Sequence, residues 1–411
     1  MGALSNGSYA AFTGTFDGCY HTISNAKATF LTSSTTVDSG RAGFFWEVGS
    51  SGRVENLALL NTQFSFRQGP SGLEPRFGGM VAAILYGTVS NVQVNGGQLD
   101  CVLRNAQGVV VKAGSWCGGI AGKVGSLSPV VQGGVLVSLK QGVISSSSSS
   151  AEVVGGSTLG GLVGVFYGRI ENSEASGAVR GGSELGGLVG SLRITFSVSN
   201  GTQIPRDFWP SIYRSKSHSS INVQVDLIES ILNSYGGLVG NASINEGLNI
   251  DESYADGAIN IPSSWATTLL PRSSAPIANW GYLGGLVGSA NNIHVKDSYS
   301  RSNISAVGTP KVGGLVGLLS GEVVEIKSSY YSATATAVSP RGIVGNNNAP
   351  YTCGVAPFNS FWNSSLLSGG SYCGSALTAA QMASASAFTS AGWLPTIWNF
   401  SGPTPRLINT P

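Results

Sequence analysis

Three side chains at equivalent positions of successive sequence repeats have the types of a nucleophile, a general base and an orienting acid: Ser176, His218 and Asp256. On stacked parallel strands they would lie on neighbouring rungs about 5 Å apart, an order that resembles a catalytic triad. The sequence offers no identifiable oxyanion hole or pocket beside them, and the rung spacing is long for direct hydrogen bonds. We therefore expect a solvated polar row in this column and predict no catalytic residue.

A second column carries two acidic side chains, Glu252 and Asp297. Carboxylates about 5 Å apart can cleave a glycosidic bond with retention. Arg214 precedes them in the column and Lys296 adjoins Asp297, so a surface charge ladder is the preferred interpretation. The 3 His residues have no adjoining Glu and no second His four positions on, which excludes an HExxH zinc site. The sequence predicts no metal and no cofactor.

Three tyrosines, Tyr254, Tyr299 and Tyr330, fall in one outward column on consecutive rungs. Outward rings would present flat, amphipathic faces about 5 Å apart, on which sugar rings or a neighbouring protein's side chains can stack. Alternatively, the rings cover one another and shield the ladder beneath them. The row is the candidate binding site, and the residues by themselves leave both interpretations open.

These columns depend on a repeat of Gly-Gly-Leu-Val-Gly. It is intact at 160–164, 186–190, 236–240, 284–288 and 313–317, with looser copies at 78–82, 118–122 and 342–345. Such a fixed period indicates a solenoid, in which neighbouring units share one core. The second glycines at 161 and 187, and those at 285 and 314, give a base unit of 26 to 29 residues. Longer intervals indicate insertions near 123–141, 192–211, 223–235 and 261–281.

Within one unit, apolar and polar residues alternate over short runs that glycines interrupt, which is typical of strands. The glycines suit bends, where the backbone needs a positive φ or a close approach. Aliphatic and leucine columns predict buried ladders, and a repeated Asn predicts a side-chain ladder at one bend. These columns are Val179, Ile221, Ile259, Ile304 and Ala335; Leu162, Leu188, Leu238, Leu286 and Leu315; and Asn56, Asn91 and Asn172.

The repeated GGLVG units, the opening stretch FTGTFDGCYHTISN at 12–25 and GRVENL at 52–57 resemble the GLUG-motif repeat family. SFWN at 360–363, LTAAQM at 377–382 and WNF at 398–400 resemble the segments commonly found after such arrays. The resemblance covers roughly residues 8–411, although Cys19 stands where the family usually has Asn. It implies a parallel β-solenoid of the kind found in large cell-surface and secreted proteins, including adhesins and the non-catalytic part of certain immunoglobulin A metallopeptidases.

Composition narrows the class of protein. Charged residues make up 10% of the chain, against about 25% in typical globular proteins. The net charge of +2 gives no basic footprint for nucleic acid. A hydrophobic share of 42% argues against disorder, and no apolar run is long enough to span a membrane. The first residues lack a signal peptide's pattern, so we expect this chain to be a mature or excised piece of a longer one.

The cysteines and the N-glycosylation sequons bear on whether the protein is exported. Of the 5 Cys, Cys101 with Cys117 and Cys353 with Cys373 flank loops that disulfides would close, as in exported proteins; five buried thiols are the alternative. Six Asn-x-Ser/Thr sequons permit N-glycosylation without arguing for it. They are Asn6, Asn200, Asn241, Asn303, Asn363 and Asn399.

The sequence therefore predicts an all-β, single-stranded parallel β-helix of about nine or ten rungs with loop insertions, about 45 Å long from the rung spacing. We expect the solenoid over residues 1–350 and a C-terminal cap over 351–411, with one short helix near Thr378 to Ala387. The cap would hide the unpaired edge of the last rung.

The expected function is that of a non-enzymatic, extracellular or cell-surface structural or adhesive protein. Its expected partners are glycans, cell-surface proteins or copies of itself; we expect no nucleic acid partner and no membrane span in this chain. The alternative is a polysaccharide-active enzyme with its site along the solenoid flank. Binding to cells, to glycans or to itself without activity favours the first function. A groove of aromatic and carboxylate side chains, together with activity on a panel of glycans, favours the second.

Overall fold

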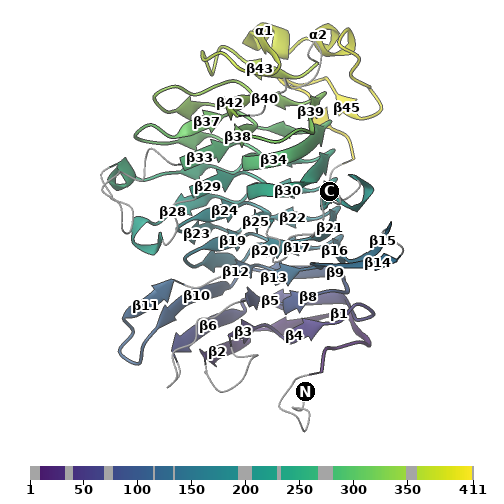
Figure 1. Cartoon of the computed structure of the whole chain (residues 1–411), viewed down its shortest axis with the longest axis vertical. Helices are drawn as coiled ribbons and strands as arrows, with labels where there is room; N and C mark the ends of the chain where they lie inside the picture. Colours follow the sequence, from purple (N-terminus) through teal and green to yellow (C-terminus); the bar gives the residue numbers. More distant parts are fainter. Residues whose placement is uncertain are drawn as a thin grey trace.

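The chain winds into a stack of parallel rungs that runs from the N-terminal end to a C-terminal cap (Figure 1). The computed structural model describes residues 10–32, 40–68, 77–113, 116–132, 135–192, 206–228, 233–266, 281–348 and 359–409. Three long parallel sheets form the sides of the stack, and strands of successive rungs are neighbours in each sheet. The predicted parallel β-solenoid is confirmed.

The first sheet has 24 strands. A turn, such as the one between Phe166 and Gly168, divides the part of each rung that lies in this sheet, with one segment before the turn and up to two segments after it. The segments before the turn are β4 (Phe45–Val48), β8 (Ala82–Leu85), β13 (Ala121–Val124), β20 (Val163–Phe166), β25 (Val189–Ser191), the first part of β30 (Val239–Asp251) and of β34 (Val287–Lys296), β38 (Val316–Leu319) and β42 (Val344–Asn347).

The segments after the turn are the later parts of β30 and β34, and β1 (Thr15–Ser24), β5 (Arg53–Leu60), β9 (Thr88–Asn95), β16 (Gly142–Ser145), β17 (Ser148–Ser149), β21 (Gly168–Glu171), β22 (Glu174–Ala175), β26 (Ser211–Tyr213), β27 (Lys216–Ser217), β31 (Tyr254–Ala255), β35 (Tyr299–Ser300), β39 (Val324–Lys327), β40 (Tyr330–Tyr331), β43 (Phe361–Asn363) and β44 (Ser375–Leu377).

The second sheet has 10 strands. Nine stack in sequence order, in agreement with the expected number of rungs, and β11 (Val110–Ala113) is antiparallel to β10. The nine are β2 (Lys27–Thr32), β6 (Gln63–Gln68), β10 (Gln98–Arg104), β18 (Glu152–Val154), β23 (Val179–Gly181), β28 (Ile221–Val223), β32 (Ile259–Asn260), β36 (Ile304–Ser305) and β41 (Ala335–Thr336).

The third sheet has 8 strands and precedes the repeated glycine bend. They are β3 (Arg41–Ala42), β7 (Phe77–Gly79), β12 (Trp116–Gly118), β19 (Thr158–Gly160), β24 (Glu184–Gly186), β29 (Asn233–Gly236), β33 (Gly281–Gly284) and β37 (Lys311–Gly313).

One core runs through the stack, as the aliphatic columns predict. The five leucines of the GGLVG motifs are fully buried, and the N–H of Leu188 donates to the carbonyl of Leu238 on the next rung at 2.9 Å. In the second sheet Val179 pairs with Ile221, and the column continues through the aliphatic residues predicted for it. Each rung therefore buries its apolar side chains against those of its neighbours, which is why a single unit has no core of its own.

The GGLVG motif forms the bend between the third and the first sheet. A Cβ on Gly237 would overlap the carbonyl oxygen of Gly285 on the next rung, and one on Gly240 would lie 2.8 Å from the backbone of Leu185. Neither glycine is among the positive-φ residues of the chain. Of the two reasons for glycine that the sequence left open, close backbone approach is the one that applies here.

The insertions leave the stack at two corners of the rungs, one between successive segments of the first sheet and one between the second and the third sheet. The segment expected near 123–141 contains an antiparallel hairpin of β14 (Ser126–Gln132) and β15 (Val135–Lys140). Short 3-10 helices occur in the described parts of the other three: η1 (Arg206–Phe208), η2 (Val225–Leu227) and η3 (Ser263–Ala266). Residues 193–205, 229–232 and 267–280 of these insertions lie outside the described residues.

The cap carries two short helices where one was expected, α1 (Ala379–Met382) and α2 (Ala385–Thr389). A capping box of Thr378 and Gln381 begins α1, because these side chains satisfy the free N–H groups of the first turn. A final hairpin pairs β45 (Trp398–Asn399) with β46 (Arg406–Leu407). Strand β43 still stacks on β40, so the rungs continue beyond residue 351. Among the described helices, none is long and apolar enough to cross a membrane.

Candidate functional site

The outward columns whose residue types could do chemistry come directly after a sharp corner within the first sheet. One residue per rung takes a left-handed φ between 44° and 53° there, a conformation that costs energy in any residue with a side chain. Asn occupies the corner in several rungs, and the Nδ2 of Asn91 donates to the Oδ1 of Asn56 at 2.8 Å, as the predicted Asn ladder requires. The corner residues are Asn56, Asn91, Ser146, Asn172, Arg214, Glu252, Asp297 and Ser328.

A ladder of buried serines holds this corner. The backbone N–H of each serine donates to the Oγ of the serine on the next rung, over 3.1 to 3.3 Å. The ladder satisfies backbone donors that the corner would otherwise leave unpaired. The side chains just after the serines therefore have fixed positions and point away from the solenoid core. The members are Ser147, Ser173, Ser215, Ser253, Ser298, Ser329 and Ser360.

His218 lies at the centre of the first charged cluster. Its Nδ1 contacts Oδ1 of Asp256, and its Nε2 lies 3.7 Å from Oε1 of Glu174. Lys216 contacts Glu174 at 3.1 Å, and Arg301 contacts Asp256 at 3.2 Å. Burial by itself would raise the pKa of Asp256, but the hydrogen bond from His218 and the nearby positive charges hold the pKa below its usual value.

Ser176 does not join this cluster as a nucleophile. The described hydrogen bonds and ion pairs of the His218 side chain run to Asp256 and Glu174, and Ser176 is exposed. The column is thus a charged, mutually neutralising row, and the triad that its residue types suggested is not assembled among the described contacts.

The second cluster contains the acidic pair of the sequence. Glu252 is paired with Arg214 at 2.9 Å, and Asp297 contacts Lys296 at 3.3 Å. Asp297 is 4% exposed and accepts a hydrogen bond from the indole of Trp398 at 3.2 Å. The pair is therefore part of a charge ladder, with Asp297 covered by the C-terminal segment.

Asp251, at the end of β30, is the unusual carboxylate of this cluster. Its Oδ1 is buried and has no hydrogen-bond partner among the described residues. Burial raises the pKa of Asp251 to about 6; the negative charges of Asp297 and Glu252 add to the shift and the positive charge of Lys296 opposes it. Sequence reasoning missed this residue, because its signal is burial rather than residue type.

We predict that Asp251→Asn stabilises the protein above pH 6. A raised folded-state pKa means that the ionised carboxylate destabilises the folded chain, fully above pH 6 and not at all below about 4. Allowing for partial exposure, the gain is about 1 to 2 kcal/mol at pH 8. Urea unfolding at pH 8 and pH 4 measures it, with the exposed Asp207→Asn as the control. A gain of equal size at both pH values would contradict the assignment.

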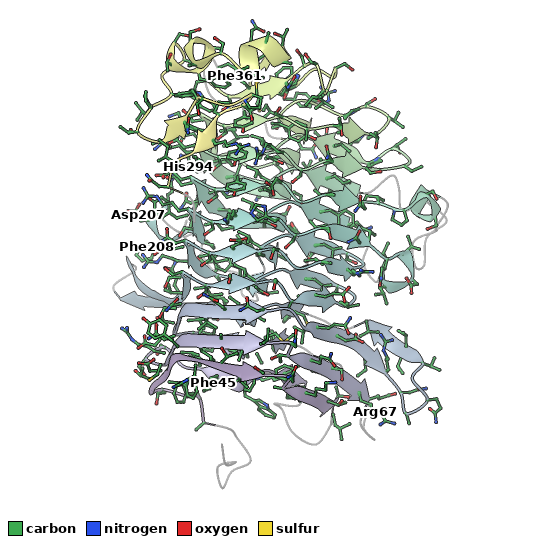
Figure 2. All side chains as sticks on the ribbon, turned by 180° about the vertical axis from the view of Figure 1, so that it is seen from behind. Phe45, Arg67, Asp207, Phe208, His294 and Phe361 are labelled. Atoms are coloured by element: carbon green, nitrogen blue, oxygen red, sulfur yellow. A yellow bond between two sulfur atoms is a disulfide. The ribbon has the colours of Figure 1, made fainter. Side chains whose placement is uncertain are left out.

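A third cluster joins an insertion to the stack. Oε2 of Glu325 contacts Nε2 of His294 at 3.1 Å and Nη1 of Arg206 at 3.2 Å. Burial, helped by the positive charge of Arg206, lowers the pKa of His294 to about 4, against the opposing charge of Glu325. His294 lies along the same edge as Asp207 of η1 (Figure 2). The contacts fasten the end of this insertion to β34 and β39.

The tyrosine row stacks as its column predicts but is not exposed. Tyr254, Tyr299 and Tyr330 pair in register, with ring centroids 4.7 and 5.0 Å apart and nearly parallel planes. Their exposed fractions are only 9%, 2% and 0%. The hydroxyl of Tyr330 donates to the carbonyl of Pro405 at 2.6 Å, and Trp398 lies against Tyr299 and Tyr330.

The prediction of an accessible binding row is therefore wrong. The rings do point away from the solenoid core, but the C-terminal segment folds back and buries them in a second apolar cluster. Burial accordingly raises the pKa of Tyr254 to about 12. The row serves as the docking face of the cap, which is closer to the shielding interpretation.

A polar cleft of about 360 Å³ lies on the outer face of the second sheet, near the N-terminal end. Two outward columns from β2, β6 and β10 line it, one of Lys27, Gln63 and Gln98 and one of Thr29, Ser65 and Asp100. Sequence reasoning missed it because the GGLVG copies near these strands are the looser ones, which left the register of the columns unassigned.

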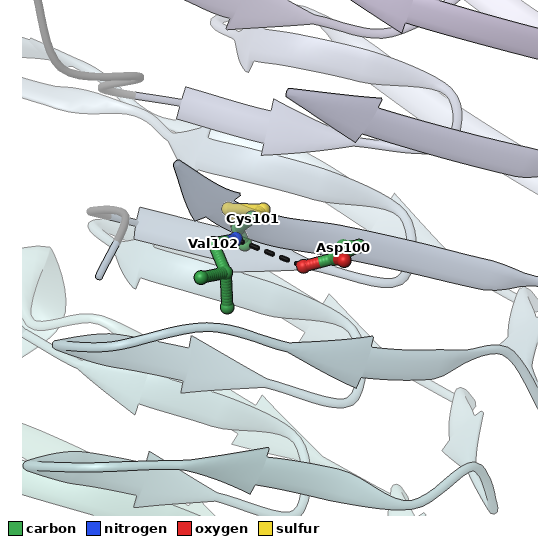
Figure 3. The surroundings of a disulfide bond; sticks show 4 residues. Asp100, Cys101 and Val102 are labelled. Atoms are coloured by element: carbon green, nitrogen blue, oxygen red, sulfur yellow. Dashed lines mark hydrogen bonds between the residues drawn. A yellow bond between two sulfur atoms is a disulfide. The ribbon is translucent and has the colours of Figure 1, made fainter. Parts of the chain in front are cut away.

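The predicted Cys101–Cys117 disulfide is present and lies buried beside the N–H of Val102, which donates to Oδ1 of Asp100 (Figure 3). It joins β10 of the second sheet to β12 of the third across 6.7 Å between Cα atoms. For the second predicted disulfide, Cys373 is buried and Cys353 lies outside the described residues. Cys19 is a free, exposed thiol.

The sequons divide by burial. Asn241 is 8% exposed and its Nδ2 donates to Glu184, and Asn363 is 5% exposed and its Nδ2 donates to Ser332. A glycan would be attached to that nitrogen. The prediction that Asn241 and Asn363 are possible glycosylation sites is therefore wrong, because both are buried residues of the fold. Asn303 and Asn399 are exposed, whereas Asn6 and Asn200 lie outside the described residues.

Comparison with known proteins identifies the repeat. A family profile described as the GLUG motif matches residues 155–180, which span the bend and corner of one rung. No curated protein and no solved structure matches the chain.

Proposed function

We propose that this GLUG-repeat β-solenoid is a non-enzymatic, extracellular or cell-surface protein with a structural or adhesive role, and that its adhesive surface binds glycans. The observation that carries the proposal is the polar cleft on the second sheet, because three stacked strands hold its lining side chains in register. Its volume of about 360 Å³ is at the lower end of the range for small-ligand sites.

The lining of the cleft suits hydroxyl-rich ligands. Gln63 and Gln98 each carry donors and acceptors, and Thr29 and Ser65 add hydroxyls that already lie 3.1 Å from one another. Lys27 and Asp100 supply one charge of each sign, so the cleft does not select a strongly charged ligand. Side chains on neighbouring rungs repeat at the strand spacing of about 4.8 Å, which lets several hydroxyls of one saccharide be held at once.

An extracellular location is supported by the Cys101–Cys117 disulfide, since such bonds persist in oxidising compartments. The charged clusters support a non-enzymatic role, because most of their carboxylates are neutralised by a cation or covered by the cap. They also lie on the first sheet, away from the cleft.

One observation favours the alternative of a polysaccharide-active enzyme. Asp251 has a buried, unpartnered oxygen and a pKa raised to about 6, which are properties of a general acid in glycoside cleavage. Assaying one panel of polysaccharides for binding and for reducing-end release separates the two functions. Release that Asp251→Asn abolishes would establish the enzyme.

The glycan-binding proposal predicts a loss of affinity in the double variant Gln63→Ala with Gln98→Ala. Removing two amide hydrogen-bonding groups is expected to weaken binding to the preferred glycan about tenfold or more. Glycan-array screening followed by calorimetry measures the change. Asn260→Ala is the matched control, because it removes an exposed amide from β32 of the same sheet, several rungs away from the strands that line the cleft. Unchanged affinity in the double variant would contradict the cleft as the site.

A further inference from the structure

Outward side chains of the third and the first sheet contact one another across the GGLVG bend. In the third sheet, one outward column contains Arg41 of β3, Phe77 of β7 and Trp116 of β12. In the first sheet, Glu47 of β4 and Lys123 of β13 share an outward column. Nη1 of Arg41 contacts Oε2 of Glu47 at 3.0 Å. On the following rungs, the amine of Lys123 lies over the ring of Phe77.

Lys123 has an unusual environment for a charged side chain. Its amine lies 5.9 Å from the ring centroid of Phe77 and 6.0 Å from that of Tyr86, at the outer limit of a cation–π contact. Burial lowers the pKa of Lys123; the positive charge of Arg41 adds to the shift and the negative charge of Glu47 opposes it. Among the described residues, no carboxylate forms an ion pair with this amine. An anion that reached it would offset the cost of burying the charge.

The same two columns treat a buried charge differently on higher rungs. Glu184 of the third sheet is 1% exposed. Its carboxylate accepts hydrogen bonds from Oγ1 of Thr158 at 2.9 Å and from Nδ2 of Asn241, in the first sheet, at 2.8 Å. The charge of Glu184 therefore has neutral donors from both sheets. The charge of Lys123 has two aromatic rings and no hydrogen-bond acceptor in the described chain.

The residues around Lys123 indicate which anion fits. Phe77 packs against Trp116 with ring centroids 5.0 Å apart, and both side chains are partly exposed. Such rings offer flat faces on which the apolar face of a sugar ring can stack. Arg41, Glu47 and Lys123 together carry one net positive charge, which suits a single carboxylate better than a polyanion. An apolar ring face and one carboxylate are combined in a sugar acid.

We propose that the side chains around Lys123 form a second saccharide site, which binds glycans that contain uronic acids. The carboxylate of the sugar contacts the amine of Lys123, and the sugar ring lies against Trp116. The site is separate from the polar cleft, because the cleft is lined by strands of the second sheet. The proposal rests on the proposed function in that the solenoid binds glycans, and it adds the chemical class that this site selects.

The first test uses the wild-type protein. Calorimetry compares oligogalacturonate, oligomannuronate and hyaluronan oligosaccharides with their methyl esters, which keep the sugar rings and lose the charge. At least one of the acids should bind about tenfold or more tightly than its ester, because the ester cannot pair with the buried ammonium group. Equal affinity for every acid and its ester, or no binding of any acid, would overturn the proposal. This comparison does not depend on how well a variant folds.

The second test removes the charge. Lys123→Met keeps an apolar side chain and should weaken binding of the acid about tenfold or more, to the affinity of the ester. Lys311→Met is the matched control, because Lys311 is exposed and belongs to the third sheet at the far end of the stack. It should leave the affinity unchanged, and circular dichroism checks that both variants are folded. A folded Lys123→Met variant with the affinity of wild type would overturn the proposal.

The double variant Gln63→Ala with Gln98→Ala separates this site from the cleft. Acid binding that survives in the double variant and is lost in Lys123→Met is the expected result. Acid binding that is lost in the double variant and survives in Lys123→Met would place the acids in the cleft, which overturns this inference and leaves glycan binding as the function. Acid binding through Lys123 in a protein whose cleft binds no glycan would refute the cleft alone.

Discussion

Replacing Leu238 by Asp is expected to cost about 5 kcal/mol or more of stability, enough to unfold most of the solenoid at room temperature. Leu238 is fully buried between Leu188 and Leu286 of the neighbouring rungs. A carboxylate there has no cation within the leucine column, so it must remain buried and unpaired or unfold its surroundings. Thermal melting followed by circular dichroism measures the loss.

The matched control for this experiment is Asn260→Asp, which introduces the same carboxylate at an exposed position of β32. It should change stability by no more than about 0.5 kcal/mol. A melting curve of Leu238→Asp that matches this control would mean that the leucine column does not face the core.

Gly237→Ala is expected to destabilise the protein by about 3 kcal/mol or more, although it adds one methyl group. That methyl would overlap the carbonyl oxygen of Gly285 and approach the Cβ of Ala255 to 2.6 Å. Backbone of the next rung cannot move aside without breaking the leucine ladder, so the overlap becomes strain or a displaced rung. Urea unfolding gives the free energy difference.

Gly370→Ala provides the control, because a Cβ at Gly370 meets nothing within 4 Å. Its effect should be near zero or slightly stabilising, since alanine restricts the unfolded chain more than glycine does. Equal stabilities of the two variants would mean that the second glycine of the motif is not needed for close approach, and that its recurrence has another cause.

The sequence predicted the stack because solenoid contacts are repetitive. A residue such as Leu238 contacts its equivalents Leu188 and Leu286 on the neighbouring rungs. Aligning the repeats in the sequence therefore predicts which residues are in contact. The alternation of apolar and polar positions then separates inward columns such as Val179 and Ile221 from outward ones. The Cys101–Cys117 disulfide was predictable for a similar reason, since it closes a short loop with a sequence separation of 16.

Only the tertiary structure decided what covers the outer surface. Trp398 reaches Asp297 across a sequence separation of 101, and no repeat encodes that contact. The alternation of inward and outward side chains along a strand predicts that Tyr299 points away from the core. It does not predict that the C-terminal segment folds back and buries this side chain. The same holds for Asn241, whose burial beside Glu184 depends on where the third sheet folds against the first. The repeat thus determined the core of the solenoid, because equivalent residues of neighbouring rungs pack on one another. The segments that cover its outer surface occur once in the sequence, and their paths depend on the packing of the whole chain.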